Sequence, residues 1–271
     1  MRRPVFLKTE KALFAGSLPA LKKAGLSGYE RLYFGNETCE RILPSVQELA
    51  KAKKVCSECS AGFSLVTPFV TDQGLKKVVR LSRGLSGDDE VIANDFGVLN
   101  AIAKSSRAEP LCGRLLNRQF RDPRIAGFSN APEELVQNLK LSHAESGLFR
   151  EMLKGLGVKR VELDNLSQGI GTSLENTGMK ATLYWPIAFV SATRFCLTAN
   201  CDKISSRKKI GIFPCGLECR AYRFELSNGF FPGPLFMIGN ALFFENPSLC
   251  KEEELAEKGI DRIVTNKALL E

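Results

Sequence analysis

Short apolar runs alternate with amphipathic segments along most of the chain of 271 residues. Runs of strand length predict β-strands at 4–8, 31–35, 90–95, 110–117, 158–164, 182–190, 223–226, 235–238 and 261–266, with one more inside 55–70 that ends at Thr67-Pro68. Apolar residues at helical spacing predict α-helices at 18–24, 43–52, 73–81, 98–104, 131–140, 147–155 and 252–258.

This alternation of strands with helices favours parallel βαβ units. About eight such units would close into a (β/α)8 TIM-type barrel. We therefore expect an α/β fold, an irregular (β/α)8 barrel, with residues 1–271 forming a single domain. An open doubly wound sheet is the alternative, although no Gly-x-Gly-x-x-Gly motif follows the first predicted strand.

Composition bears chiefly on the use of the nine cysteines. A chain of this length can bury a core without disulfide bonds, and an odd number of cysteines argues against a complete set of them. The basic start of the sequence is not followed by an apolar stretch, because Lys8, Glu10 and Lys11 interrupt it. We expect no export signal, no membrane span and a cytoplasmic location, where thiols stay reduced and metal or cluster ligation is their leading use.

Charge and histidine content narrow the function further. The net charge of +8 favours anionic partners such as nucleic acid, a carboxylate or phosphate substrate, or an acidic protein. The chain has one histidine, His143, which excludes a His-Glu-x-x-His zinc peptidase and any zinc site of two cysteines and two histidines within one chain. No nucleophile elbow accompanies it, so His143 is predicted to be a surface residue at the start of a helix.

Cysteines gather in one stretch, where Cys196, Cys201, Cys215 and Cys219 fall within 24 residues. In a (β/α)8 barrel, the carboxyl ends of the strands meet on one face. Cys39 follows strand 31–35, Cys196 follows strand 182–190, and Cys215 and Cys219 lie on the next loop. These four thiols could therefore meet, and four thiolates without a histidine fit an iron–sulfur cluster or an all-cysteine zinc site.

The remaining cysteines have more ordinary interpretations. Cys56 and Cys112 lie in predicted apolar strands, where a free cysteine packs as a small hydrophobic residue. Cys56 and Cys59 form a Cys-x-x-Cys pair, for which a redox role is the alternative. Cys201 is close enough to Cys196 to be a ligand, a spare thiol or an exposed loop residue. Cys250 has no predicted role.

Several motifs, by their order and spacing, resemble the collagenase-like peptidase family U thirty-two. They are Leu-Tyr-Phe-Gly-Asn-Glu-Thr-Cys at 32–39, Ala-Asn-Asp-Phe-Gly at 93–97, Gly-Arg-Leu-Leu-Asn at 113–117, Pro-Ile-Ala-Phe-Val-Ser-Ala-Thr-Arg-Phe-Cys at 186–196, and Cys-x-x-x-Cys at 215–219. The resemblance runs from Val5 to Asn266 and is greatest to the UbiV-like branch, which acts in oxygen-independent ubiquinone synthesis. Segment 120–178 matches poorly, and Cys201 and the basic run 206–209 depart from the pattern.

The resemblance implies an irregular barrel with an oxygen-sensitive [4Fe–4S] cluster, whose ligands would be Cys39, Cys196, Cys215 and Cys219. It also implies a heterodimer with a sister protein. The implied reaction is hydroxylation of a quinone precursor with prephenate, rather than dioxygen, as the oxygen donor. Other branches hydroxylate RNA bases, and some members are described as peptidases of unknown catalytic type.

An anionic dicarboxylate such as prephenate would suit a basic rim formed by Arg194, Arg207 and Lys208. Three residues at predicted strand ends are further site candidates: Asn94, Asp95 and Asn117. The alternative is that they begin helices, because Asn and Asp are common N-cap residues. RNA is the alternative partner for the basic charge, but no RNA-binding module is evident in the sequence. A peptidase is the weakest alternative, since the chain has one histidine and no nucleophile motif. Catalytic residues beyond the thiols are not predicted.

Overall fold

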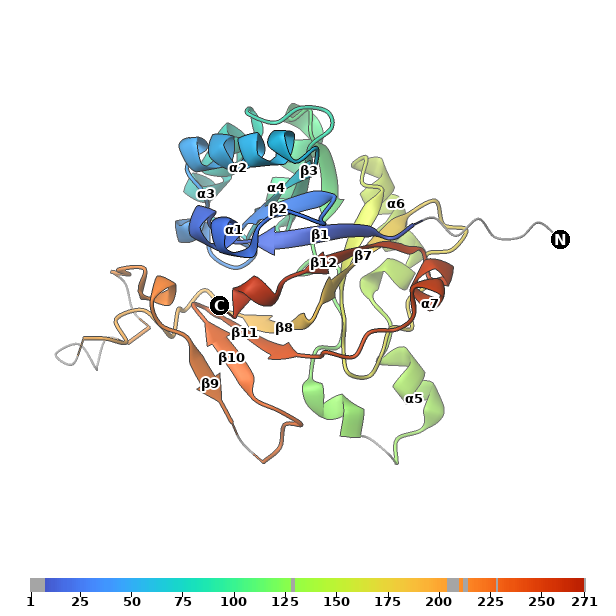
Figure 1. Cartoon of the computed structure of the whole chain (residues 1–271). Coiled ribbons are helices and arrows are strands. Elements are labelled where there is room, and N and C mark those ends of the chain that lie inside the picture. Colours follow the sequence, from blue (N-terminus) through green and yellow to red (C-terminus); the bar gives the residue numbers. More distant parts are fainter. Residues whose placement is uncertain (1–7, 128–129, 204–209, 212–213, 228, 271) are drawn as a thin grey trace.

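The computed structural model describes residues 8–127, 130–203, 210–211, 214–227 and 229–270. In this part of the chain, eight parallel strands close into a barrel in the order β1-β12-β7-β6-β5-β4-β3-β2 (Figure 1). The barrel strands are β1 (Glu10–Ala15), β2 (Arg31–Gly35), β3 (Gly62–Thr67), β4 (Glu90–Ala93), β5 (Glu109–Cys112), β6 (Arg160–Asp164), β7 (Lys180–Trp185) and β12 (Ile260–Thr265). The predicted α/β (β/α)8-type barrel is thereby confirmed.

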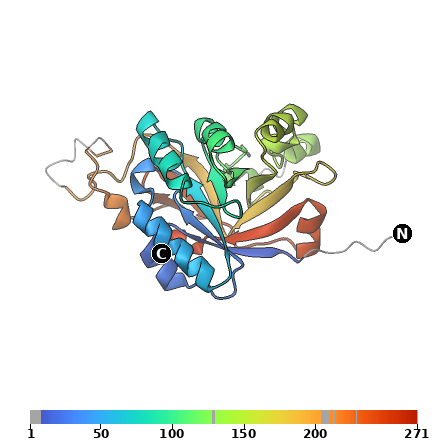
Figure 2. The same ribbon diagram turned by 90° about the horizontal axis from the view of Figure 1, so that it is seen from above.

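The helices lie outside the strands, as Figure 2 shows for the blue-to-green part of the chain. They are α1 (Leu18–Ala24), α2 (Val46–Glu58), α3 (Asp72–Ser82), α4 (Phe96–Ser105), α5 (Glu133–Asn138), α6 (Gly147–Gly155) and α7 (Glu252–Glu257). Each predicted helix has a counterpart among them, with ends that differ by a few residues. None of the described helices has the length and apolarity needed to cross a membrane.

Two apolar layers result from the alternation of side chains along each barrel strand. In β2, Tyr33 belongs to the cluster inside the barrel, whereas Leu32 and Phe34 belong to the cluster between strands and helices. The inner cluster consists of Ala12, Phe14, Tyr33, Val66, Ile92, Leu111, Tyr184 and Val264. The barrel is therefore a packed core, and its functional surface lies at the strand ends.

A second sheet was not foreseen from the sequence. Strand 182–190, predicted as one element, is two: β7 ends at Trp185, and β8 (Ile187–Ala192) begins after Pro186. β7 pairs with β12 in the barrel, whereas β8 joins an antiparallel sheet in the order β8-β11-β10-β9. Proline has no N–H to donate to a strand neighbour, which explains why the run breaks there.

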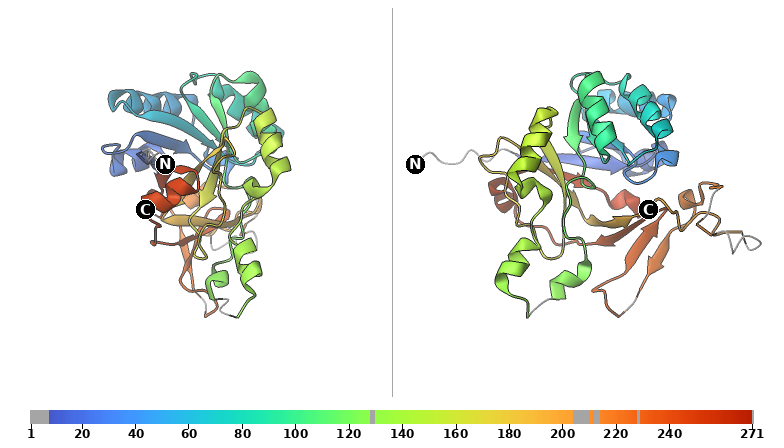
Figure 3. Two further views of the ribbon diagram at one scale, coloured as in Figure 1. Left: turned by 90° about the vertical axis from the view of Figure 1, so that its right-hand side faces the viewer. Right: turned by 180° about the vertical axis from the view of Figure 1, so that it is seen from behind.

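The other members of this sheet are β9 (Phe224–Leu226), β10 (Leu235–Ile238) and β11 (Ala241–Glu245). The strands predicted at 223–226 and 235–238 therefore exist, but they form the second sheet and not barrel units. The chain from β8 to β11 is an insertion between barrel strands β7 and β12. Figure 3 shows this insertion, in orange, extending away from the barrel.

The first predicted strand, 4–8, lies outside the described residues except for Lys8. The first barrel strand that the structure describes is β1, in which Glu10 forms ion pairs with Arg31 and Arg262. Two further expectations need correction. Cys56 lies in helix α2 and not in a strand, because the capping box of Ser45 and Glu48 starts a helix that continues to Glu58. The strand predicted at 110–117 ends at Cys112, after which the chain turns.

Candidate functional site

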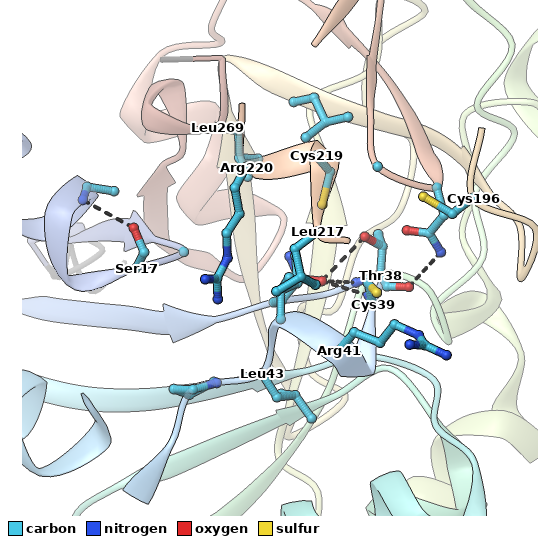
Figure 4. Close-up of a pocket in the computed structure, with 18 of the residues that line it drawn as sticks. Ser17, Thr38, Cys39, Arg41, Leu43, Cys196, Leu217, Cys219, Arg220 and Leu269 are labelled. Atoms are coloured by element: carbon cyan, nitrogen blue, oxygen red, sulfur yellow. Dashed lines mark hydrogen bonds between the residues drawn. The ribbon is translucent and has the colours of Figure 1, made fainter. Parts of the chain in front are cut away.

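Cys39, Cys196, Cys215 and Cys219 all line one cavity of about 430 Å³ at the carboxyl end of the barrel strands. Figure 4 shows Cys39, Cys196 and Cys219 around this opening, which also contains Arg41 and Arg220. The thiols come from three segments: the loop after β2, the segment after β8, and the loop before β9. The structure therefore brings together the four cysteines that the sequence singled out.

The loop after β2 positions Cys39. The Asn36 side-chain oxygen Oδ1 accepts hydrogen bonds from the backbone N–H groups of Thr38 (2.9 Å) and Cys39 (2.7 Å), which forms a tight turn. Gly35, at the end of β2, has φ +135°, and a Cβ there would lie 2.3 Å from the carbonyl oxygen of Val66. This turn therefore depends on glycine at one position and asparagine at the next.

Asn240, between β10 and β11, joins the loops that carry Cys39 and Cys196. Its side-chain Nδ2 donates hydrogen bonds to the carbonyl oxygens of Thr38 (2.8 Å) and Thr193 (2.6 Å). Its backbone carbonyl oxygen accepts a hydrogen bond from the Thr193 N–H (2.9 Å). Asn240 is 8% exposed and lines the cavity. Its Oδ1 is buried without a hydrogen-bond partner among the described residues.

Glu218, which is 6% exposed, organises the loop with Cys215 and Cys219. Its carboxylate accepts hydrogen bonds from the Gly216 N–H (3.0 Å) and from Lys203 Nζ (3.1 Å), and the Leu217 N–H donates to Cys215 Sγ (3.3 Å). Lys203 also donates a hydrogen bond to the Asn200 side chain. Because Lys203 precedes 204–209 and Glu218 follows it, the bond between Lys203 and the Glu218 carboxylate joins the segments on either side. Burial alone would raise the pKa of Glu218, but these hydrogen bonds lower it below its usual value.

The thiols affect one another electrostatically. Burial raises the pKa of Cys39, and the neighbouring Cys196 and Cys215 raise it further. Burial, together with Cys196, Cys39 and Cys215, raises the pKa of Cys219 to about 11. Thiolates at this site would repel one another, and a bound cation removes that penalty. Across the described residues, no set of three or more His, Cys, Asp or Glu side chains is arranged to hold a metal ion.

The other cysteines lie elsewhere. Cys201 is half-buried near Cys196 but does not line the cavity, and burial together with Asp202 raises its pKa. Cys59 is exposed at the end of α2, whereas burial raises the pKa of its neighbour Cys56 to about 12, which disfavours a reactive thiolate. Cys112 is buried at the end of β5, as expected of a small hydrophobic residue, and Cys250 is half-buried.

The polar residues proposed at strand ends have structural roles. Asn94 and Asn117 exchange hydrogen bonds with backbone groups of neighbouring strands and loops, and Asp95 is the N-cap of α4. Of the predicted basic rim, Arg194 lines the cavity, while Arg207 and Lys208 lie outside the described residues. His143 is exposed at the start of a short 3₁₀ helix, His143–Glu145, as expected.

Arg114 was missed as a key residue, although it lies within a segment noted for its family resemblance. Its side chain is fully buried and donates to Glu37 (2.6 Å), Asp164 (2.6 Å) and the carbonyl oxygen of Ile187 (3.1 Å). It also lies 4.1 Å above the ring of Tyr184. A charged residue directly after an apolar strand was the available signal, but it did not reveal these partners.

No family model matches the sequence, and no curated protein matches it. Among solved structures, the chain is similar to the U32 peptidase Mk0906, at 12% identity and TM-score 0.45, over 97% of this chain and 96% of that one. It is also similar to the putative copper homeostasis protein CutC from Streptococcus agalactiae, at 10% identity and TM-score 0.43, over 96% of this chain and 99% of that one. Similarities this weak say nothing about the activity of this chain.

Proposed function

We propose that Cys39, Cys196, Cys215 and Cys219 hold a [4Fe–4S] cluster. We further propose that the chain is the iron–sulfur subunit of an oxygen-independent hydroxylase that acts on a quinone precursor with a sister subunit. The observation that carries the proposal is that four thiols from three chain segments line one cavity. The chain's one histidine, His143, lines a different hollow, so the thiol cavity offers no imidazole as a ligand. A cluster of this kind supplies single-electron transfer when bound.

The donor set supports a cluster. Four thiolates are the usual ligands of a [4Fe–4S] cluster. A tetrahedral zinc ion would use the same four sulfurs at about 2.3 Å, so metal analysis distinguishes the two. Asn240 and Glu218 hold the cysteine loops in place through hydrogen bonds to the backbone. These residues act as a supporting shell for the ligands.

The charge around the thiols suits an anionic oxygen donor such as prephenate. Arg41, Arg194, Arg220 and Arg223 line the cavity, and among the described residues Glu48 is the one carboxylate that lines it. The Glu48 carboxylate already accepts a hydrogen bond from the Ser45 N–H (2.7 Å) in the capping box. The excess of guanidinium groups therefore favours binding of a carboxylate-bearing molecule beside the thiols.

Anaerobic purification followed by iron and sulfide analysis and a visible spectrum tests the cluster. We expect broad visible absorbance and about four iron atoms per chain, both lost in Cys39→Ser and Cys215→Ser. Cys59→Ser is the matched control, because Cys59 is exposed at the end of α2, and it should keep the cluster. A colourless anaerobic protein with stoichiometric zinc would contradict the proposal.

A second assay addresses the reaction itself. Under anaerobic conditions, we expect prephenate to bind the iron-loaded chain, and Arg194→Gln together with Arg220→Gln to weaken that binding. RNA is the competing anionic partner, and it is tested by a gel-shift titration in the same buffer at two salt concentrations. Tight, salt-dependent RNA binding without prephenate binding would favour an RNA-directed activity instead.

A further inference from the structure

A second hollow lies at the carboxyl end of the barrel strands, beside α4 and β8, and has a volume of about 880 Å³. Asn94 and Asp95, which directly follow β4, line it, as do residues of the loop after β5, of β8 and of α6. The carboxyl ends of barrel strands are where barrel enzymes place their active sites. This hollow therefore occupies a favourable position for a ligand, apart from the thiols.

The lining offers aromatic and apolar surface to solvent. Phe96 is 48% exposed and Met152 is 41% exposed, and both line the hollow. Phe149, which is half-buried, and Phe189, which is 6% exposed, line it as well. Large apolar side chains that remain exposed together in a concave site are typical of a surface that a ligand covers. Several phenyl rings favour a flat ring as that ligand, since rings stack or pack edge to face.

The charges in the hollow point to an anionic group on the ligand. Within the described parts of the chain, the side chain of Arg118 lines the hollow and forms no ion pair or hydrogen bond. Two other lining residues have partners: Arg121 pairs with Asp164, and the His143 ring packs edge to face against Phe149 with centroids 5.7 Å apart. Asp95 also lines it, but its carboxylate already accepts hydrogen bonds from the N–H groups of Val98 (3.1 Å) and Val70 (3.4 Å). A cation beside exposed rings matches a carboxylate on an aromatic molecule.

An aromatic pair lies between this hollow and the thiol cavity. Phe189 lines the hollow, Phe243 lines the thiol cavity, and their ring centroids lie 5.8 Å apart in an edge-to-face arrangement. One ring of this pair thus lines each site. A ligand in the hollow would not touch the cysteines.

We propose that this hollow is a binding site for a small planar aromatic molecule that carries one carboxylate. Phe96 packs against the ring, and Arg118 pairs with the carboxylate. The site does not depend on the proposed cluster, so it goes beyond the proposed function.

Fluorescence titration of the full chain with 2-naphthoate tests this site. We expect saturable binding that weakens about tenfold in Phe96→Ala and in Arg118→Gln, and neutral 2-naphthamide should bind more weakly than 2-naphthoate. Phe230→Ala and Arg83→Gln are the matched controls, because both residues are exposed and line neither site. Far-ultraviolet circular dichroism checks that every variant is folded.

The proposal would be overturned by no saturable binding to the wild type, or by equal weakening in the Phe230→Ala and Arg83→Gln controls. Cys39→Ser separates the two proposals, since it should abolish iron retention and leave 2-naphthoate binding unchanged. Loss of 2-naphthoate binding in Cys39→Ser, with normal binding in Phe96→Ala, would place the probe in the thiol cavity and refute this site.

Discussion

The guanidinium of Arg114 lies between the carboxylates of Glu37 and Asp164, and all three side chains are buried. Removing Arg114 leaves the buried Glu37 carboxylate without its ion-pair partner, whereas Asp164 keeps its ion pair with Arg121 (2.7 Å). An uncompensated buried charge of this kind costs about 3–5 kcal/mol. We therefore expect Arg114→Leu to lower the free energy of unfolding by about this amount in urea titrations.

The exposed pair of Arg124 and Asp122 is the control for Arg114. Arg124→Leu should change the free energy of unfolding by less than about 1 kcal/mol, because exposed ion pairs contribute little. Equal stability of Arg114→Leu and the wild type would contradict the structural role of this arginine. Arg114→Leu should also retain iron less well, because Glu37, the partner of Arg114, lies two residues before Cys39.

Glu162 makes stability depend on pH. Burial inside the barrel raises its pKa to about 7, even though Arg262 and Arg160 lower it, and its Oε2 has no hydrogen-bond partner among the described residues. The folded state therefore holds the proton more tightly than the unfolded chain, whose usual pKa is 4.5. This stabilisation is complete below pH 4.5 and is lost as the pH rises towards 7.

Glu162→Gln, which cannot ionise, should flatten this part of the stability profile. Urea unfolding measured between pH 4.5 and 8 checks the expectation. The wild type should lose stability across that interval relative to the variant. Parallel profiles for the two proteins would show that Glu162 does not titrate there.

At the level of elements, the turn between β10 and β11 holds the thiol loops together. Asn240→Ala removes the hydrogen bonds to the carbonyl oxygens of Thr38 and Thr193, which should lower the free energy of unfolding by about 1–3 kcal/mol. We also expect faster loss of iron to a chelator from the anaerobic protein, because both thiol loops are then freer to move.

Asn246→Ala provides a matched control for this turn. Its Nδ2 donates to the carbonyl oxygen of Asn165, and Asn246 does not line the thiol cavity. It should lose stability without losing iron faster. If both variants release iron at the wild-type rate, the turn does not support the thiol site.

The sequence predicted the local elements well and the second sheet poorly. Helix α2, predicted at 43–52, begins at Val46, after a capping box formed by Ser45 and Glu48. These two residues lie three positions apart, so the signal for the start of the helix is local. The division of 182–190 at Pro186 depends on which strands are available as neighbours, namely β12 for β7 and β11 for β8. The apolar pattern is the same in β7 and in β8, so it does not reveal that the run 182–190 is divided.

For the whole molecule, the thiol site joins the loop after β2 to the insertion that extends from the barrel. A cluster bound to the folded state alone would stabilise it. We expect the iron-free protein, prepared with a chelator under anaerobic conditions, to unfold several degrees below the iron-loaded protein in a thermal scan. Cys39→Ser should unfold at the iron-free temperature whether or not iron is supplied, and an unchanged midpoint on iron removal would contradict this linkage.

The sequence by itself determined the alternation of strands and helices, the helix caps and the order of the four thiols. These features depend on residues close together in the chain, so local patterns reveal them. Only the tertiary structure decided that the cysteines line one cavity, that Asn240 reaches Thr38 across 202 residues, and that Arg114 bridges Glu37 and Asp164. Such contacts form when barrel closure brings distant strand ends together, and no local pattern encodes which side chains then meet.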